Sequence, residues 1–356
     1  MALKTFARTI VCGATMLHAS IASGQSVAFD WDQSAGYSTE EVRAVHTRLR
    51  AFGEVTPDVR FNIAGVWGKQ SEESDAFAAA YPYTEHPVVL DAYAERTFRP
   101  AGRLLGVRVG RYRTPFGISS ESDQGYVGFQ RDPLIRYDDF FALSSAFFEH
   151  GADVIVGSPR LSVEMSLGAS GDVGEHTRTT GANAVVRGQA VAGSVIVGLS
   201  YIDTHPHLAR AGGGPAPIIA TDAGLDLTRE HEDEVGPGSS RFGGIDVRWM
   251  RGGVQLRGEF IGGRPFDGAR THGGYIDLIV HRPVMGPITA ALRAEHLAHT
   301  DGSIVILHGE RYTAATRIRV VRGFTALVEI VHDSQTLPQR RPTAVDIALS
   351  YSLRLD

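Results

Sequence analysis

Several features on which other classes of protein depend are scarce in this sequence. Cys12 is its only cysteine, so no disulfide bond can stabilise the chain. No stretch approaches the roughly 18 consecutive apolar residues that a membrane-spanning helix needs. The formal net charge of −5 is mild and indicates neither a nucleic-acid partner nor a basic membrane anchor. The His-Glu-x-x-His zinc helix, the Gly-x-Ser-x-Gly elbow and the Walker loop are absent. We therefore expect no enzymatic activity and no cofactor.

The N-terminal residues have the composition of an export signal. Lys4 and Arg8 precede an apolar run over residues 9–17, and the small residues at 22–24 form a plausible cleavage site. The alternatives are an amphipathic helix that the mature protein keeps and a lipoprotein signal. We predict a signal peptide over residues 1–24.

The remaining chain, residues 25–356, is predicted to be one domain, because no Pro/Ser-rich linker or block of charge divides it. Within it, apolar and polar residues alternate in stretches of about 8 to 13. In the last stretch, alternate positions from Val345 to Leu355 are apolar, while Asp346, Ser350 and Arg354 lie on the other face. This period of two predicts β-strands with one apolar and one polar face.

The connections between these stretches alternate between short and long. The short ones contain turn residues, such as Thr56-Pro57-Asp58 and Arg322-Gly323. Outer-membrane barrels have this asymmetry, with short periplasmic turns and long extracellular loops. The predicted strands are 42–52, 59–68, 87–98, 103–112, 146–157, 160–169, 180–189, 193–203, 241–250, 253–262, 272–282, 287–297, 309–321, 323–332 and 343–355.

An additional strand is required before residue 42 if the short turns are periplasmic, because the strand at 42–52 must then run inward from outside. Val27, Phe29 and Trp31 alternate with polar or small residues and supply it. We therefore predict an all-β fold, a 16-stranded antiparallel transmembrane β-barrel in the outer membrane of a Gram-negative bacterium. A barrel of this size is too wide for side chains to fill, which favours an aqueous channel.

The polar faces of the predicted strands carry many charges. So many arginines and carboxylates cannot all lie in a dry core, so we expect water to reach them. Pairing between neighbours along the wall is the alternative role for any single residue. The predicted pore-lining residues are Arg48, Arg108, Arg257, Arg293, Arg317, Glu95, Glu259 and Glu295.

The long connection over residues 113–145 is both aromatic and acidic, with six Phe or Tyr residues. A loop that was only solvated would have little use for these rings. We hypothesise that it folds into the lumen and constricts it, setting its carboxylates opposite the arginines. The alternative is packing over the rim or against a neighbouring subunit. The predicted constriction residues are Glu121, Asp123, Asp132, Asp138 and Asp139.

A second long connection, over residues 204–240, contains His205, His207 and an acidic run at 230–234. We interpret it as a solvated exterior loop, with calcium bridging to lipopolysaccharide as the alternative. Two other classes of protein stay open. A barrel enzyme would need a serine, a histidine and an acid on the outer wall near the rim. A secreted β-rich adhesin would keep a dry core with mostly uncharged inward faces.

Residues Gly110 to Gly117, with the sequence Gly-Arg-Tyr-Arg-Thr-Pro-Phe-Gly, end a predicted strand and open the loop at 113–145. They resemble the Gly-Arg/Lys-x-x-x-Pro-Phe-Gly element of the phosphate-selective porin O/P-like family. The resemblance implies a homotrimer in contact with outer-membrane lipid and lipopolysaccharide, and passive, anion-favouring diffusion of small hydrophilic solutes or ions. The chain departs from that family in having Lys69 as its only lysine after the predicted signal peptide, and in ending on Asp356 rather than on an aromatic residue.

Overall fold

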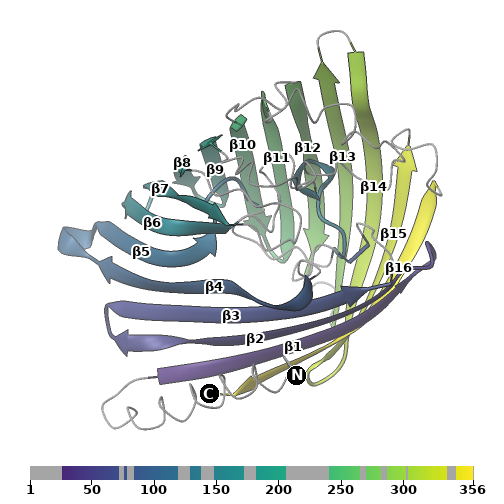
Figure 1. Ribbon diagram of the computed structural model, residues 1–356, viewed down its shortest axis with the longest axis horizontal. Helices are drawn as coiled ribbons and strands as arrows, with labels where there is room; N and C mark the ends of the chain where they lie inside the picture. Colours follow the sequence, from purple (N-terminus) through teal and green to yellow (C-terminus); the bar gives the residue numbers. More distant parts are fainter. Residues whose placement is uncertain are drawn as a thin grey trace, which may run out of the picture.

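The structure is a computed structural model, and it forms a single closed barrel of 16 antiparallel strands (Figure 1). It describes residues 26–71, 76–77, 84–118, 129–137, 148–171, 182–205, 240–264, 270–281, 287–301, 304–334 and 342–355. Each strand pairs with its neighbours in sequence, and β1 closes the sheet by pairing with β16. The predicted all-β, 16-stranded antiparallel barrel is confirmed, including its N-terminal strand.

The strands are β1 (Ser26–Ser38), β2 (Arg43–Thr56), β3 (Val59–Gln70), β4 (Thr84–Phe98), β5 (Leu104–Arg113), β6 (Phe148–Gly157), β7 (Leu161–Gly171), β8 (Ala182–Ala192), β9 (Val195–His205), β10 (Ser240–Arg251), β11 (Val254–Arg264), β12 (Arg270–Val280), β13 (Ile288–Asp301), β14 (Ile304–Val321), β15 (Phe324–Ser334) and β16 (Thr343–Leu355). A 3-10 turn, η2 (Pro100–Gly102), joins β4 to β5, and a short helix, α3 (Leu134–Tyr137), follows β5. Among the described residues, no helix is both long and apolar enough to cross a membrane.

Two strands begin earlier than the sequence pattern predicted. β4 starts at Thr84 rather than at 87, and β14 starts at Ile304 rather than at 309. The start of β14 is a continuous apolar run without alternation, so the period of two could not reveal it.

Tight turns join the strands at one end of the barrel. β10 ends at Arg251 and β11 begins at Val254, and β14 and β15 are joined in the same way between Val321 and Phe324. Gly252 and Gly323 occupy these turns with φ values of 59° and 83°. Two-residue hairpin turns need this left-handed backbone, which glycine adopts without steric cost.

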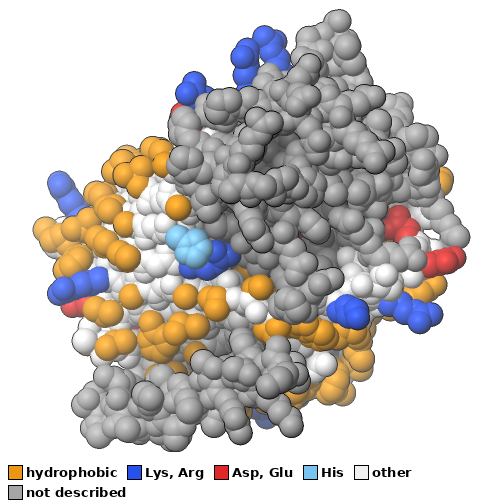
Figure 2. All heavy atoms as spheres, viewed as in Figure 1, with side chains coloured by type: hydrophobic (Ala, Val, Ile, Leu, Met, Phe, Trp, Pro, Cys, Tyr) orange, Lys and Arg blue, Asp and Glu red, His pale blue; other side chains and the backbone are white. Residues whose placement is uncertain are grey.

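The apolar face of each strand points outward. Leu199, Ile245 and Phe260 are direct partners on three neighbouring strands, and all three are exposed. Figure 2 shows hydrophobic side chains, in orange, gathered across the described strands on the face in view. Their polar neighbours along each strand, such as Asp246 and Glu259, are buried inside. The barrel is therefore apolar outside and charged inside.

Candidate functional site

The element at residues 110–117 spans the end of β5 and the start of the loop, and the chain turns into the barrel after Arg113. Gly110 has a φ of 131°, and a Cβ there would lie 2.2 Å from the carbonyl oxygen of Ala92, so only glycine fits. Phe116 then packs with Val185 of β8 and Phe242 of β10 in a buried apolar cluster. The element that suggested a family resemblance thus has a structural role in directing the chain inward.

Two parts of the long loop, residues 114–118 and 129–135, are buried against the inner wall, and we call them the inner segments. The first contacts β8 and β9, where Arg187 donates a hydrogen bond to the carbonyl of Gly117, and the amide of Gly117 donates to Oγ of Ser200 at 3.1 Å. Arg187 also pairs with Asp246 at 3.1 Å. This segment is therefore attached to the wall by polar contacts as well as by Phe116.

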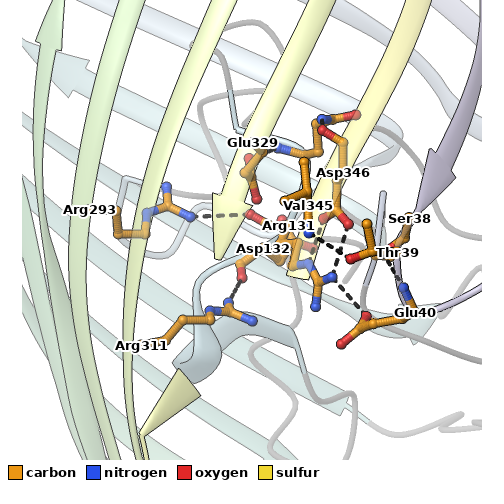
Figure 3. A network of polar contacts seen from close by, with 12 residues as sticks. Ser38, Thr39, Glu40, Arg131, Asp132, Arg293, Arg311, Glu329, Val345 and Asp346 are labelled. Atoms are coloured by element: carbon orange, nitrogen blue, oxygen red, sulfur yellow. Dashed lines mark hydrogen bonds and ion pairs between the residues drawn. The ribbon is translucent and has the colours of Figure 1, made fainter. Parts of the chain in front are cut away.

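The second inner segment is attached to the far side of the wall through Arg131 (Figure 3). Its Nε donates to Oδ2 of Asp346 at 2.7 Å, and one terminal nitrogen donates to Oε2 of Glu40 at 2.8 Å. The amide of the preceding residue, Gln130, donates to Oε2 of Glu329 at 2.6 Å. A loop cation is thus bound by wall carboxylates next to the seam where β1 meets β16.

Wall arginines bind the backbone of the same segment. Arg293 donates to the carbonyl of Arg131 at 3.2 Å, and Arg311 donates to the carbonyl of Asp132. The guanidinium of Arg293 also lies 3.8 Å from the centroid of the Phe129 ring, which is a cation–π contact. The amide of Leu134, at the start of α3, donates to Oε1 of Glu295 at 3.1 Å.

These contacts differ in part from the hypothesis made for this loop. We expected loop carboxylates to face wall arginines, whereas the structure sets a loop arginine against wall carboxylates and loop carbonyls against wall arginines. Asp132 lies in the buried second segment. The other four predicted constriction residues, Glu121, Asp123, Asp138 and Asp139, lie outside the described residues.

Four predicted pore-lining residues lie on the part of the wall that the second inner segment covers. Arg257 and Arg293 share Asp277, at 2.8 Å and 2.7 Å. Glu295 accepts a hydrogen bond from Nε of Arg311 at 2.5 Å. Glu259 is also buried. Because water does not reach these charges, they form a closed network of buried ion pairs.

Three other predicted residues lie on the opposite part of the wall and stay in contact with solvent. Arg108 of β5 pairs with Glu95 of β4 at 3.2 Å, and its side chain is 25% exposed. It also lies 3.5 Å from Asp153 and 3.7 Å from Glu164. The side chain of Arg48 is 17% exposed and lies 3.9 Å from the nearest carboxylate oxygen of Asp32.

The remaining residue, Arg317, is half-buried on β14 in the same inward row as Arg311 and Thr313. It follows Ala315, which packs with Phe129 of the second inner segment, and so lies nearer the turn end of the strand.

Residues that the sequence analysis missed hold much of this interior together. Arg311 has the same strand parity as Arg317, so its inward direction was available from the alternation. Asp277 shares its face with Tyr275 and Ile279, which made that face look apolar. Arg131 lies in a loop, where no period exists to indicate what it contacts.

A metal site is not evident in the part of the chain that the structure describes, since no three His, Cys, Asp or Glu residues there are arranged to hold an ion. The loop at 204–240 falls almost wholly outside the described residues, and so does the calcium interpretation of its acidic run.

Comparison with solved structures identifies the architecture. OmpF of Salmonella typhi, solved in complex with daunomycin, superposes with a TM-score of 0.61 at 7% sequence identity, covering 92% of this chain and 97% of that one. The fold is that of a porin. A variant of the Rhodopseudomonas blastica porin gives 0.52 at 10% identity, covering 92% of this chain and all of that one.

A further structure described as a porin gives a TM-score of 0.52 at 12% identity, again covering 92% of this chain. No protein-family model and no curated protein matches the sequence. These likenesses are to general porins, and they do not single out the phosphate-selective family suggested by residues 110–117.

Proposed function

We propose that this protein is an outer-membrane porin, a passive diffusion channel for small hydrophilic solutes or ions. The observation that carries the proposal is the distribution of polarity in a closed barrel. Exposed apolar side chains such as Leu199 and Phe260 cover the outside, and ion pairs such as Arg257 with Asp277 lie inside. A barrel in lipid needs an apolar exterior.

The passage runs along the part of the wall formed by β1–β7. The inner segments occupy the other side of the lumen, next to β8–β16, where most of the paired charges are buried and Arg248 of β10, 19% exposed, is an exception. Arg108, Glu95 and Arg48 keep partial exposure on the free side. Since a lumen of this strand number is wider than side chains can fill, the exposed charges mark the water-filled route.

Anion preference, which the family resemblance implies, remains a prediction, and the ion pairs of the wall argue against a strong one. Arg108 has three carboxylates within 3.7 Å, on Glu95, Asp153 and Glu164. Arg48, the other partly exposed arginine on this side of the lumen among the predicted residues, has Asp32 beside it. The described wet wall therefore carries no excess of positive charge, and we expect reversal potentials near zero or shifted toward cations.

The placement in a Gram-negative outer membrane and the homotrimer complete the proposal. The placement is supported by the export signal predicted over residues 1–24, which lie outside the described residues, together with the apolar exterior. The homotrimer is supported by the family resemblance.

Barrel-enzyme chemistry is not favoured by the outer wall. His296 pairs in register with Glu310, and Ser334 pairs with Glu310 on its other side. A nucleophilic triad needs the histidine between the serine and the acid. Here the acid lies between them, so Ser334 is not placed to give its proton to His296.

Planar bilayer recording with the purified mature protein tests the proposal. We expect discrete current steps whose size rises with salt concentration. A gel shift on heating, which reports a closed barrel, is the control for folding. A heat-modifiable barrel that gives no steps would contradict the channel. Recovery in the soluble secreted fraction would instead favour the adhesin alternative.

A further inference from the structure

The loop end of the outer wall carries a row of arginines. Arg241 of β10 pairs in register with Arg264 of β11. On the next strand, Gly263 pairs with Thr271, which places Arg264 beside Arg270 at the rim. All three arginines are exposed, and their strand parity is that of the outward-facing Ile245, Phe260 and Ile276.

Among the described residues of this row, charge is unbalanced. Asp203 of β9 pairs with Arg241 at 3.1 Å and ends the row on one side, while Thr300 of β13, a neutral residue, is the register partner of Arg270 on the other. Like charges directly opposite each other on neighbouring strands are unfavourable. A bound anion would relieve this repulsion.

A gap in the side chains lies directly below the arginine row. Gly243 and Gly262 are register partners there, flanked by Tyr201 on β9 and His272 on β12. We call these two glycines the glycine gap.

Neither the backbone nor crowding explains the two glycines. Neither has a positive φ, and a Cβ would meet no heavy atom nearer than 4.0 Å at Gly243 and 3.7 Å at Gly262. Glycine inside a strand weakens it and often marks a place where a ligand approaches the backbone. The gap therefore leaves room on the outer surface for a bound group.

An apolar row continues below the gap. Leu199, Ile245 and Phe260 are register partners with exposed fractions of 61%, 45% and 52%. From rim to mid-barrel, the surface thus presents cationic, open and apolar zones in that order. This order of zones matches an amphipathic ligand with an anionic head and hydrocarbon chains.

We propose that this surface of β9–β12 binds a membrane lipid whose phosphate head group carries a net negative charge. The arginine row holds the phosphate, because guanidinium groups form strong hydrogen bonds to phosphate oxygens. The glycine gap receives the backbone that joins the phosphate to the acyl chains, and the acyl chains lie on the apolar row. Free inorganic phosphate would leave the gap and the apolar row without a role. The inference rests on the membrane location in the proposed function, but not on channel activity.

Native mass spectrometry of the detergent-solubilised protein tests this site, with phosphatidic acid as the probe and phosphatidylcholine as the comparison lipid. The test variant combines Arg241→Gln, Arg264→Gln and Arg270→Gln. We expect wild type to retain phosphatidic acid, and the variant to bind it on the order of a hundredfold more weakly, from about 1 kcal/mol for each arginine near a lipid surface.

Arg251→Gln is the matched control, because Arg251 is exposed on the same strand as Arg241 but at the turn end. It should bind like wild type. Gly243→Leu fills the gap without changing the charge, and it should also weaken binding.

Equal retention of phosphatidic acid by wild type and the triple variant would overturn the proposal. Equally effective displacement by inorganic phosphate at the same concentration would overturn it too, because the site would then be one for free phosphate. Channel recording on the same samples separates the two proposals. Lost lipid binding with unchanged current steps supports this inference, whereas arginine-dependent lipid binding without any current would contradict only the channel.

Discussion

Glu95 and Glu295 each accept a hydrogen bond from an arginine on the next strand inside the same barrel, but their environments differ. The side chain of Glu95 is 26% exposed beside Arg108, and that of Glu295 is 1% exposed beside Arg311. The difference comes from the second inner segment, which covers Glu295 and donates the amide of Leu134 to it. We call the two regions the wet wall, on β1–β7, and the sealed wall, on β8–β16 beside the inner segments.

The comparison shows that ion pairs between the same two residue types have different roles in the two regions. An ion pair with water around it contributes little to stability, so the wet wall is free to set the field that a permeating ion meets. Breaking a buried pair leaves a charge without solvent or partner, so the sealed wall determines whether the loop stays docked.

The largest expected effect comes from Arg131→Gln. It removes the cation that binds Asp346 of the sealed wall and Glu40 of the connection between β1 and β2, and leaves the buried carboxylate of Asp346 without it. We expect a loss of about 3–5 kcal/mol in stability and a larger, noisier single-channel conductance as the inner segment detaches. Thermal unfolding and bilayer recording measure these effects. Arg319→Gln, at an exposed arginine near the turn end of β14, is the control; equal behaviour of the two variants would contradict the anchoring role.

A second large effect is expected from Asp277→Asn, which removes the carboxylate shared by Arg257 and Arg293. We expect destabilisation of about 3 kcal/mol. Asp32→Asn is the matched change on the wet wall and should cost under about 1 kcal/mol. Midpoints of the heat-modifiable gel shift would compare the two variants, and a larger loss for Asp32→Asn would reverse the assignment of the walls.

A change in selectivity is expected from Arg108→Gln, together with some loss of stability, because the buried carboxylate of Asp153 loses its cation. It leaves Glu95, Asp153 and Glu164 without their shared cation, so the permeability of cations over anions should rise by about twofold to fivefold. Reversal potentials in a salt gradient measure the ratio. An unchanged potential would mean that ions do not pass this part of the wall.

The smallest effect is expected from Arg48→Gln. A carboxylate oxygen of Asp32 lies 3.9 Å from Nε of Arg48 and both groups are partly solvated, so the ratio should rise by less than about twofold. A shift larger than that of Arg108→Gln would place the narrowest point beside β2 rather than beside β5.

The sequence predicted the strands and their directions well, because alternation is a local signal. Arg257 and Arg293 were placed on the inward face by parity alone. Their state of solvation could not be predicted in this way. It depends on where Arg131 docks, and its partner Asp346 lies 215 positions further along the chain.

Two other parts of the interior show why local patterns were insufficient. Asp277 pairs with two arginines, but it shares the inward face of its strand with Tyr275. The sequence pattern therefore did not indicate a charged inward face on that strand. Loop carboxylates were expected to face the arginines, but the arginines bind loop carbonyls, which every residue has. Composition cannot indicate a contact of that kind.

Accessibility of single cysteines tests the division of the lumen most directly. Cys12 is the only native cysteine and lies in the predicted signal peptide, so Glu95→Cys and Ala315→Cys would each carry one thiol in the mature protein. Ala315 packs with Phe129 of the second inner segment in a buried cluster, so its replacement breaks no ion pair. A negatively charged methanethiosulfonate reagent, added during bilayer recording, should react with Glu95→Cys and reduce the current, and should leave Ala315→Cys unchanged until the barrel is unfolded. Modification of Ala315→Cys in the folded channel as fast as that of Glu95→Cys would contradict the account.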